Sequence, residues 1–216
     1  ITGQSNHAGT TPMAMRHDPA YAAASVGTFA RELATELGPP QVATVGRIEL
    51  RPNLINVVPA SATLTVDLRN TDDAVLREAE ARLAAHCSAL EQAEGVAIER
   101  RTLARFEPVA FAPDMVDLVE RTARAHGHTV RRLPSGAGHD AQMLARVCPT
   151  AMVFTPSVDG ISHNPAERTE PADLEAGANV LLAVLCELAG ARVADRTGPA
   201  EGGGGAGAAG VGEERT

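Results

Sequence analysis

The stretch "QVATVGRIELRPNLINVVPASATLTVDLR", residues 41–69, decides the fold of the first half of the chain. Its two ends, 41–50 and 62–69, are rich in Val, Thr, Leu and Ile, a composition that is typical of β-strands. The segment between them, 51–61, contains two prolines, which interrupt regular strand pairing. We therefore expect two strands that are joined by a loop or a bulged segment.

Helical patterns flank these two strands. Residues 18–37 read as a helix, because Asp18 is a suitable N-cap and Pro19 suits the first helical position. Residues 71–93 read as a second, amphipathic helix that opens on a Thr-Asp-Asp cap. The segment "VAIERRTLARF", 96–106, is predicted as a third strand.

This order of elements predicts a compact α+β domain over residues 1–106, in which two helices cover one face of an antiparallel sheet. If residues 1–4 are the end of a preceding strand, the order becomes βαββαβ. The pattern changes after this domain, and we place a domain boundary near 106–110.

The rest of the chain, 107–192, alternates helix and strand in the manner of a parallel α/β sheet. The expected elements are a helix at 113–126, a strand at 129–132, the Gly-rich turn "PSGAGHDA" at 134–141, a strand at 150–155 and a helix at 171–189. The remaining segment, 193–216, is rich in Gly and poor in large apolar residues, so we expect it to be disordered.

Composition excludes several classes of protein. With 44% hydrophobic and 21% charged residues, the chain is expected to be globular. Its net charge of −8 argues against nucleic-acid binding, which needs a basic stripe. The chain has no apolar run of 18 residues and no signal-peptide layout, so we expect no membrane association.

The three cysteines are widely spaced and odd in number, which predicts three buried thiols in a reducing, cytoplasmic compartment rather than a disulfide framework. The first residue is Ile1, inside the loop-like "ITGQSNHAGTTP". A domain seldom starts so abruptly, and we expect the chain to be a fragment that lacks an upstream part.

The seven histidines differ in their positions. Four lie at helix edges or ends, where a surface or packing role is expected: His17, His86, His126 and His128. His7 lies in a loop before a helix, where binding groups concentrate, although its neighbours Asn6 and Thr10 are also common turn residues.

His139 follows a Gly-rich turn at the predicted start of a helix. Gly136 and Gly138 would let the backbone approach a ligand closely, and a helix N-terminus favours an anion. The alternative is a tight strand-to-helix turn that His139 and Asp140 cap. Both interpretations stay open from the residues alone.

His163 follows the predicted strand 150–155, at the strand end where ligands bind in open α/β sheets. A neutral imidazole there could bind a metal, with Ser162, Asn164 or Glu167 as supporting partners. A metal site needs three or more protein ligands, so His163 alone is only a candidate.

Arg69 ends the second predicted strand, where its guanidinium could hold a carboxylate through two parallel hydrogen bonds, and Asn56 is its candidate partner. The alternative for Arg69 is a surface salt bridge with Asp67, Asp72 or Asp73.

Four stretches together resemble the amidase branch of the M20 metallopeptidase family, which holds N-carbamoyl-L-amino-acid hydrolases, allantoate amidohydrolases and ureidopropionases. These stretches are "GQSNHAGTTPMAMRHD" (3–18), "RPNLINVVPASATLTVDLRNTD" (51–72), "SGAGHDAQ" (135–142) and "PSVDGISHNPAERT" (156–169). The resemblance extends from residue 1 to about 190, in the same order. Within it, "NHAGTTPM" and "GISHNPAE" are specific to the amidase branch.

The resemblance implies a catalytic α/β domain with two divalent metal ions, Zn²⁺ or Mn²⁺, and an inserted domain that mediates homodimerisation. Residues 1–106 resemble the inserted domain, and 107–192 the last part of the catalytic domain. The implied reaction is hydrolysis of the ureido C–N bond of a small ureido acid, in which a metal-bound hydroxide attacks the carbonyl carbon.

The resemblance also implies a role for individual residues. His163 matches a metal ligand, and His7 matches the residue that reaches the substrate carbonyl, across the dimer. Asn56, Arg69 and Gly138 match substrate-binding positions, with Arg69 on the substrate carboxylate.

The sequence departs from the family pattern in one large respect. The other four metal ligands and the glutamate general base lie upstream in the family, so we expect the chain alone to be inactive. An M20 peptidase or aminoacylase is the second candidate, which "NHAGTTPM" disfavours. A non-catalytic dimerisation or ligand-binding module is the alternative from another class.

Overall fold

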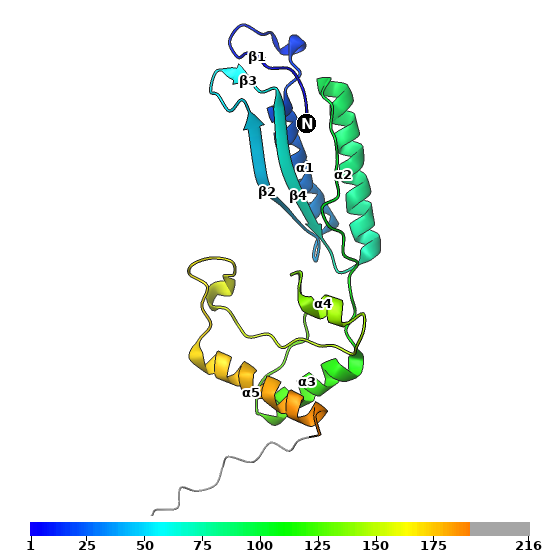
Figure 1. Cartoon of the computed structure of the whole chain (residues 1–216), viewed down its shortest axis with the longest axis vertical. Coiled ribbons are helices and arrows are strands. Elements are labelled where there is room, and N and C mark those ends of the chain that lie inside the picture. The colour runs from blue at the N-terminus through cyan, green and yellow to red at the C-terminus, as the bar shows by residue number, and fades with distance from the viewer. Residues whose placement is uncertain (191–216) are drawn as a thin grey trace, which may run out of the picture. The chain divides into compact units, whose positions relative to one another are not determined.

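The computed structural model describes residues 1–190 (Figure 1). They divide into two compact units: the first contains residues 1–116 and 131–151, and the second contains 117–130 and 152–190. The predicted domain boundary near 106–110 stays a prediction. The tail predicted at 193–216 lies outside the described residues.

Two antiparallel strands form the centre of the first unit. β2 (Val42–Arg51) pairs with β4 (Ser61–Arg69), so that Val42 lies opposite Arg69 and Arg51 opposite Ser61. A β-bulge follows Val45. These strands confirm the two predicted from the sequence. The loop between them contains the short strand β3 (Val57–Val58), which pairs with β1 (Asn6–His7).

The two helices of this unit begin at the residues that the capping signals predict. α1 (Pro19–Leu37) starts with Pro19 at the first helical position, and the carboxylate of Asp18 accepts a hydrogen bond from the backbone N–H of Ala20 at 2.9 Å. α2 (Asp73–Glu94) is capped in the same way by Asp72, which accepts from Ala74 N–H at 2.8 Å.

α1 and α2 lie beside the sheet of β2 and β4 (Figure 1). Apolar side chains from both helices pack against it. The core contains Val26 of α1 with Cys87 and Leu90 of α2, and Leu64 and Val66 of β4 pack against it. The predicted packing role of His86 is confirmed, because its ring stacks on Phe29 with 4.1 Å between ring centroids. As aromatic residues are few, burial of small aliphatic side chains supplies most of the stabilisation.

The prediction of a strand at 96–106 is wrong. Only Ala97 of this segment pairs, in an isolated bridge with Thr2, which also bridges Ser61. Side chains of α2 bind the rest of the segment: Glu91 accepts the backbone N–H of Ile98, and Arg105 forms salt bridges with Glu80 and Asp73. The Glu91 carboxylate thus binds one backbone N–H that a neighbouring strand would otherwise bind. The described residues do not form the continuous four-stranded sheet of the βαββαβ prediction.

The predicted parallel sheet is also wrong for the described residues. Within residues 1–190, the segments 129–132 and 150–155 do not form strands and do not pair with another strand. A strand is stable only when a neighbour takes its backbone N–H and C=O groups, and local composition cannot supply that neighbour. Sheets in this structure are therefore small and antiparallel.

The predicted helices of the second half are present. These are α3 (Pro113–Ala125), the short α4 (Asp140–Leu144) and α5 (Pro171–Leu188), with 3-10 turns at Met13–Met15 and Val158–Gly160. In the second unit Arg121 of α3 forms an ion pair with Glu187 of α5 at 2.5 Å. None of the helices within residues 1–190 is long and apolar enough to span a membrane.

The expectation of three buried thiols holds for one cysteine. Cys87 is buried in the core, and burial raises the pKa of its thiol. Cys148, in a bend after α4, is exposed and Cys186, on α5, is half-buried, so neither thiol is buried as predicted.

The packing of α1 yields a test of the fold. Leu33 is 1% exposed, whereas Leu103 is 69% exposed. We expect Leu33→Ala to lower the free energy of unfolding by about 2–5 kcal/mol, because it removes buried surface and leaves a cavity. The matched variant Leu103→Ala should change it by less than about 0.5 kcal/mol. Urea unfolding monitored by circular dichroism measures both, and equal losses would contradict the packing described here.

Candidate functional site

His7 lies at the end of β1, in an exposed loop that its own hydrogen bonds fix. The backbone N–H of Gly9 donates to the ring Nδ1 of His7 at 3.0 Å. Because Nδ1 is the acceptor, the neutral ring carries its proton on Nε2. His7 therefore presents an N–H donor on the ring nitrogen farther from the backbone.

Arg16 holds this loop closed. Its guanidinium donates to the backbone carbonyls of Ala8 and Thr11, at 2.6 and 3.1 Å. The hydroxyl of Thr11 donates to the carbonyl of His7 at 2.7 Å. The sequence singled out neither Gly9 nor Arg16, and a charged side chain bonded to two loop carbonyls gives no periodic or spacing signal.

Asn56 lies beside His7. It precedes β3, and its backbone carbonyl accepts a hydrogen bond from Ala8 N–H at 3.0 Å. The pairing of His7 with Val57 brings the two loops together. Asn56 is exposed, so its side-chain amide is open to solvent next to the histidine loop.

Arg69 ends β4 and is held by two different partners. Its Nε and Nη2 donate to the two carboxylate oxygens of Asp67, at 2.9 and 2.7 Å. Its Nη1 donates to the backbone carbonyl of Gly136 at 2.7 Å. Of the three acids named as possible surface partners, Asp67 is the one that pairs. The hydrogen bond and charge of Arg69 hold the pKa of Asp67 below its ordinary value.

Gly138 lies two residues from the carbonyl that Arg69 contacts. A Cβ atom added at Gly136 or Gly138 would meet nothing within 4 Å, and neither residue has a positive φ. Within the described chain, neither crowding nor backbone strain requires glycine there. The space in front of this backbone is open.

His139, next to this segment, is the N-cap of α4. Its Nδ1 accepts a hydrogen bond from Ala141 N–H at 3.0 Å. The capping interpretation of the sequence is thus confirmed for His139.

The four candidate residues of the first unit form two groups at opposite ends of the sheet. His7 and Asn56 form one group, and Arg69 and Gly138 form the other. β1 and β3, with His7 and Asn56, lie where β2 ends and β4 begins, and Arg69 is the last residue of β4 (Figure 1). The nine residues of β4, at about 3.3 Å per residue, separate the two groups by roughly 26 Å. One small substrate cannot span this distance.

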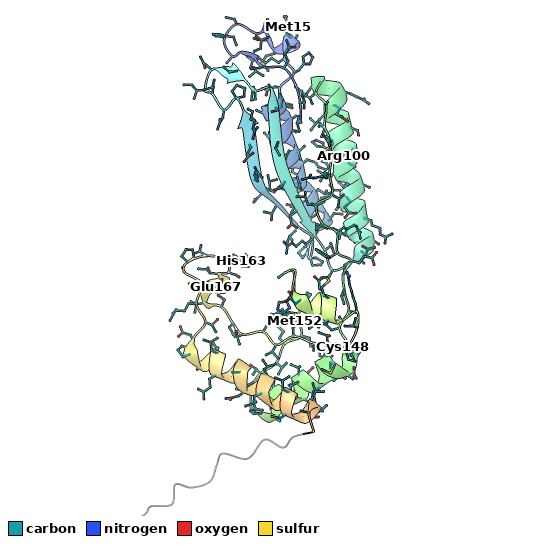
Figure 2. The ribbon with its side chains drawn as sticks, in the orientation of Figure 1. Met15, Arg100, Cys148, Met152, His163 and Glu167 are labelled. Atoms are coloured by element: carbon teal, nitrogen blue, oxygen red, sulfur yellow. The ribbon has the colours of Figure 1, made fainter. Side chains whose placement is uncertain are left out.

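His163 belongs to the second unit, in the exposed loop before α5 (Figure 2). Its φ of 55° lies in the left-handed region. The carboxylate of Glu167 accepts the backbone N–H of His163 at 2.8 Å, and Asn164 accepts the backbone N–H of Ala166 at 2.9 Å. Glu167 and Asn164, two of the predicted supporting residues, therefore bind the backbone of the loop. The His163 side chain is exposed to solvent.

Comparison with known proteins identifies the family. The chain matches Peptidase family M20/M25/M40 over residues 5–187. This chain belongs to the M20 family. It is 42% identical over 189 residues to an allantoate amidohydrolase of Escherichia coli, which covers 88% of the chain and 46% of the relative. It is 38% identical to an N-carbamoyl-L-amino-acid amidohydrolase of Rhizobium meliloti, over 88% of the chain and 45% of that protein.

A solved structure agrees. An amidase of the hydantoinase/carbamoylase family from Burkholderia vietnamiensis superposes with a TM-score of 0.84 at 41% identity, covering 86% of the chain and 45% of the amidase. The M20 chain therefore spans about half the length of the relatives that it matches.

The described residues of this M20 chain do not by themselves form a metal centre. No three side chains among the His, Cys, Asp and Glu of residues 1–190 lie close enough to hold a metal ion. His163 could supply one ligand, but the carboxylate of Glu167 is bonded to the backbone N–H of His163.

The open space at Gly138 yields a prediction for the M20 chain. We expect Gly138→Ala to leave the free energy of unfolding unchanged or to raise it by up to about 1 kcal/mol. Gly3→Ala is the matched control, because its Cβ would lie 2.3 Å from the carbonyl oxygen of His17. This overpacking should lower the free energy of unfolding by about 1–3 kcal/mol. Urea unfolding compares the two, and a loss at Gly138 as large as at Gly3 would show that Gly138 is needed for the fold.

Proposed function

We propose that this chain supplies the substrate carboxylate site and one metal ligand of an M20 amidohydrolase. The substrate is an N-carbamoyl-L-amino acid or a related ureido acid such as allantoate or ureidopropionate, and the bond hydrolysed is the ureido C–N bond. The observation that carries the proposal is the Arg69 guanidinium held beside the open Gly136–Gly138 backbone. The names of the relatives support the same reaction.

In this proposal Arg69 binds the substrate carboxylate. A guanidinium matches the planar carboxylate and donates two parallel hydrogen bonds to it. The exposed backbone at Gly138 lets the substrate approach closely, since no Cβ stands in the way. Asn56 lies beside His7 at the other end of the sheet, so its side-chain amide would reach the amino-acid end of the substrate from a second copy of the chain.

His7 donates from Nε2–H to the carbonyl oxygen of the ureido group. The hydrogen bond from Gly9 fixes this tautomer without any charge on the ring. Negative charge develops on the carbonyl oxygen during attack, so the donor binds the transition state more tightly than the substrate. One such donor contributes on the order of 10²–10³ in rate.

The distance between the two groups supports a homodimer. His7 and Arg69 lie at opposite ends of one sheet, so we propose that each site combines Arg69 of one copy with His7 of another. Symmetric pairing of two copies would build two equivalent sites.

We propose that His163 contributes one ligand to a divalent metal, Zn²⁺ or Mn²⁺. Its position in an exposed, left-handed turn keeps the imidazole available. At least two further protein ligands would have to come from outside residues 1–190.

A chimera tests the proposal. Residues 1–190 of this chain replace the matching 189 residues of the Escherichia coli allantoate amidohydrolase, and the product is assayed with added Zn²⁺ or Mn²⁺. We expect hydrolysis of a ureido acid. Arg69→Ala should raise KM about 10- to 100-fold, because a charged hydrogen-bond partner of the carboxylate is lost. Arg69→Ala should leave KM unchanged for the amide analogue of the same ureido acid, because that analogue has no carboxylate for Arg69 to bind.

Arg47→Ala is the matched control, since Arg47 also forms an exposed ion pair on the sheet, with Glu49 at 2.5 Å. An unchanged KM in Arg69→Ala would contradict the carboxylate assignment. An inactive chimera, together with calorimetric binding of an N-carbamoyl amino acid by the 216-residue chain without metal, would identify a ligand-binding module instead.

A further inference from the structure

The contact between Asp67 and Arg69 has a specific geometry. Both residues lie on β4, two positions apart, so their side chains leave the strand on the same face. The carboxylate of Asp67 accepts from Nε and Nη2 of Arg69, which is the side-on edge of the guanidinium. This leaves the opposite part of the guanidinium turned away from Asp67.

The carbonyl of Gly136 fixes the other terminal nitrogen. It accepts from Nη1 of Arg69 at 2.7 Å, across 67 positions of sequence. A guanidinium has five N–H groups, and the contacts in the described part of the chain use three of them. One N–H on each terminal nitrogen remains, and a pair of donors on the two terminal nitrogens can bind the two oxygens of a carboxylate.

Stability does not explain this arrangement. The side chains of Asp67 and Arg69 are each 48% exposed, and an exposed ion pair contributes only about 0–1 kcal/mol. The neighbouring pair Arg47–Glu49 has the same spacing on β2, but a single nitrogen of Arg47 contacts Glu49. Of Arg47 and Arg69, only Arg69 donates two hydrogen bonds to its acidic partner and a third to a distant segment.

We propose that Asp67 is a positioning residue: together with the Gly136 carbonyl it holds Arg69 so that one N–H of each terminal nitrogen faces the substrate carboxylate. This inference rests on the proposed function of Arg69. An arginine side chain loses about 2 kcal/mol of rotamer entropy when it is fixed. Fixing it in advance lowers the cost of binding the substrate.

The first test uses the full 216-residue chain and needs no substrate. Nuclear magnetic resonance of the arginine Nε–H groups, with the Arg69 signal assigned from Arg69→Lys, measures hydrogen exchange with solvent. We expect Asp67→Asn to accelerate exchange at Arg69 about tenfold, because one charged acceptor is lost. Glu49→Gln, the matched control, should leave Arg69 unchanged. Equal exchange in Asp67→Asn and the unaltered chain would overturn the positioning role.

The second test measures function in the chimera. Asp67→Asn should raise KM for the ureido acid about tenfold with kcat within about twofold, and should leave KM for its amide unchanged. In an Arg69→Ala background, Asp67→Asn should have no further effect. If Arg69→Ala raises KM but Asp67→Asn leaves KM unchanged or lowers it, the inference about Asp67 is overturned. If Arg69→Ala has no effect either, the proposed function fails, and the exchange measurement still decides whether Asp67 holds Arg69.

Discussion

The antiparallel pairing of β2 with β4 is the constraint on which the rest of the first unit depends. Its register sets Arg51 opposite Ser61 and Val42 opposite Arg69. The loop between the strands therefore lies at one end of the sheet, with Asn56 and the β1–β3 pair that carries His7. Arg69 lies at the other end. A shift of one residue would turn the Arg69 side chain to the opposite face of the sheet.

The same pairing supports the two helices. α1 packs against β2 and β4 and α2 packs against β4, and the core residues Val26, Cys87 and Leu90 come from both helices. These side chains are small or aliphatic, so the stability of the domain depends on close packing along the helix–sheet contact rather than on a few large aromatic residues. The capping carboxylates of Asp18 and Asp72 fix where each helix begins relative to the sheet.

Local signals in the sequence were sufficient for elements that depend on local chemistry. Caps and apolar periodicity predicted α1 and α2, and composition predicted β2 and β4. The same reasoning failed at 96–106, 129–132 and 150–155, where a strand needs a partner from elsewhere. In 96–106, the Glu91 side chain binds one backbone N–H, that of Ile98, and Glu80 binds the side chain of Arg105.

The candidate site shows the same division. Motifs predicted His7, Asn56, Arg69, Gly138 and His163 as site residues, and the structure shows where in the fold each of them lies. Some of the groups that hold these residues are backbone atoms, such as Gly9 N–H and the Gly136 carbonyl. Every residue has such atoms, so no motif reveals which of them make a contact. Asp67 was visible in the sequence only as one of three possible surface partners.

The central claim is that each site takes His7 and Arg69 from different copies, and mixing two variants with impaired hydrolysis tests it most directly. Chimeras carrying His7→Ala or Arg69→Ala are refolded separately and together, and ureido-acid hydrolysis is measured below saturation. If each site takes His7 and Arg69 from different copies, half of the randomly paired dimers are mixed, and each has one intact site. The mixture should then recover about a quarter of the unaltered activity. A mixture as inactive as the separate variants would show that one copy supplies both residues.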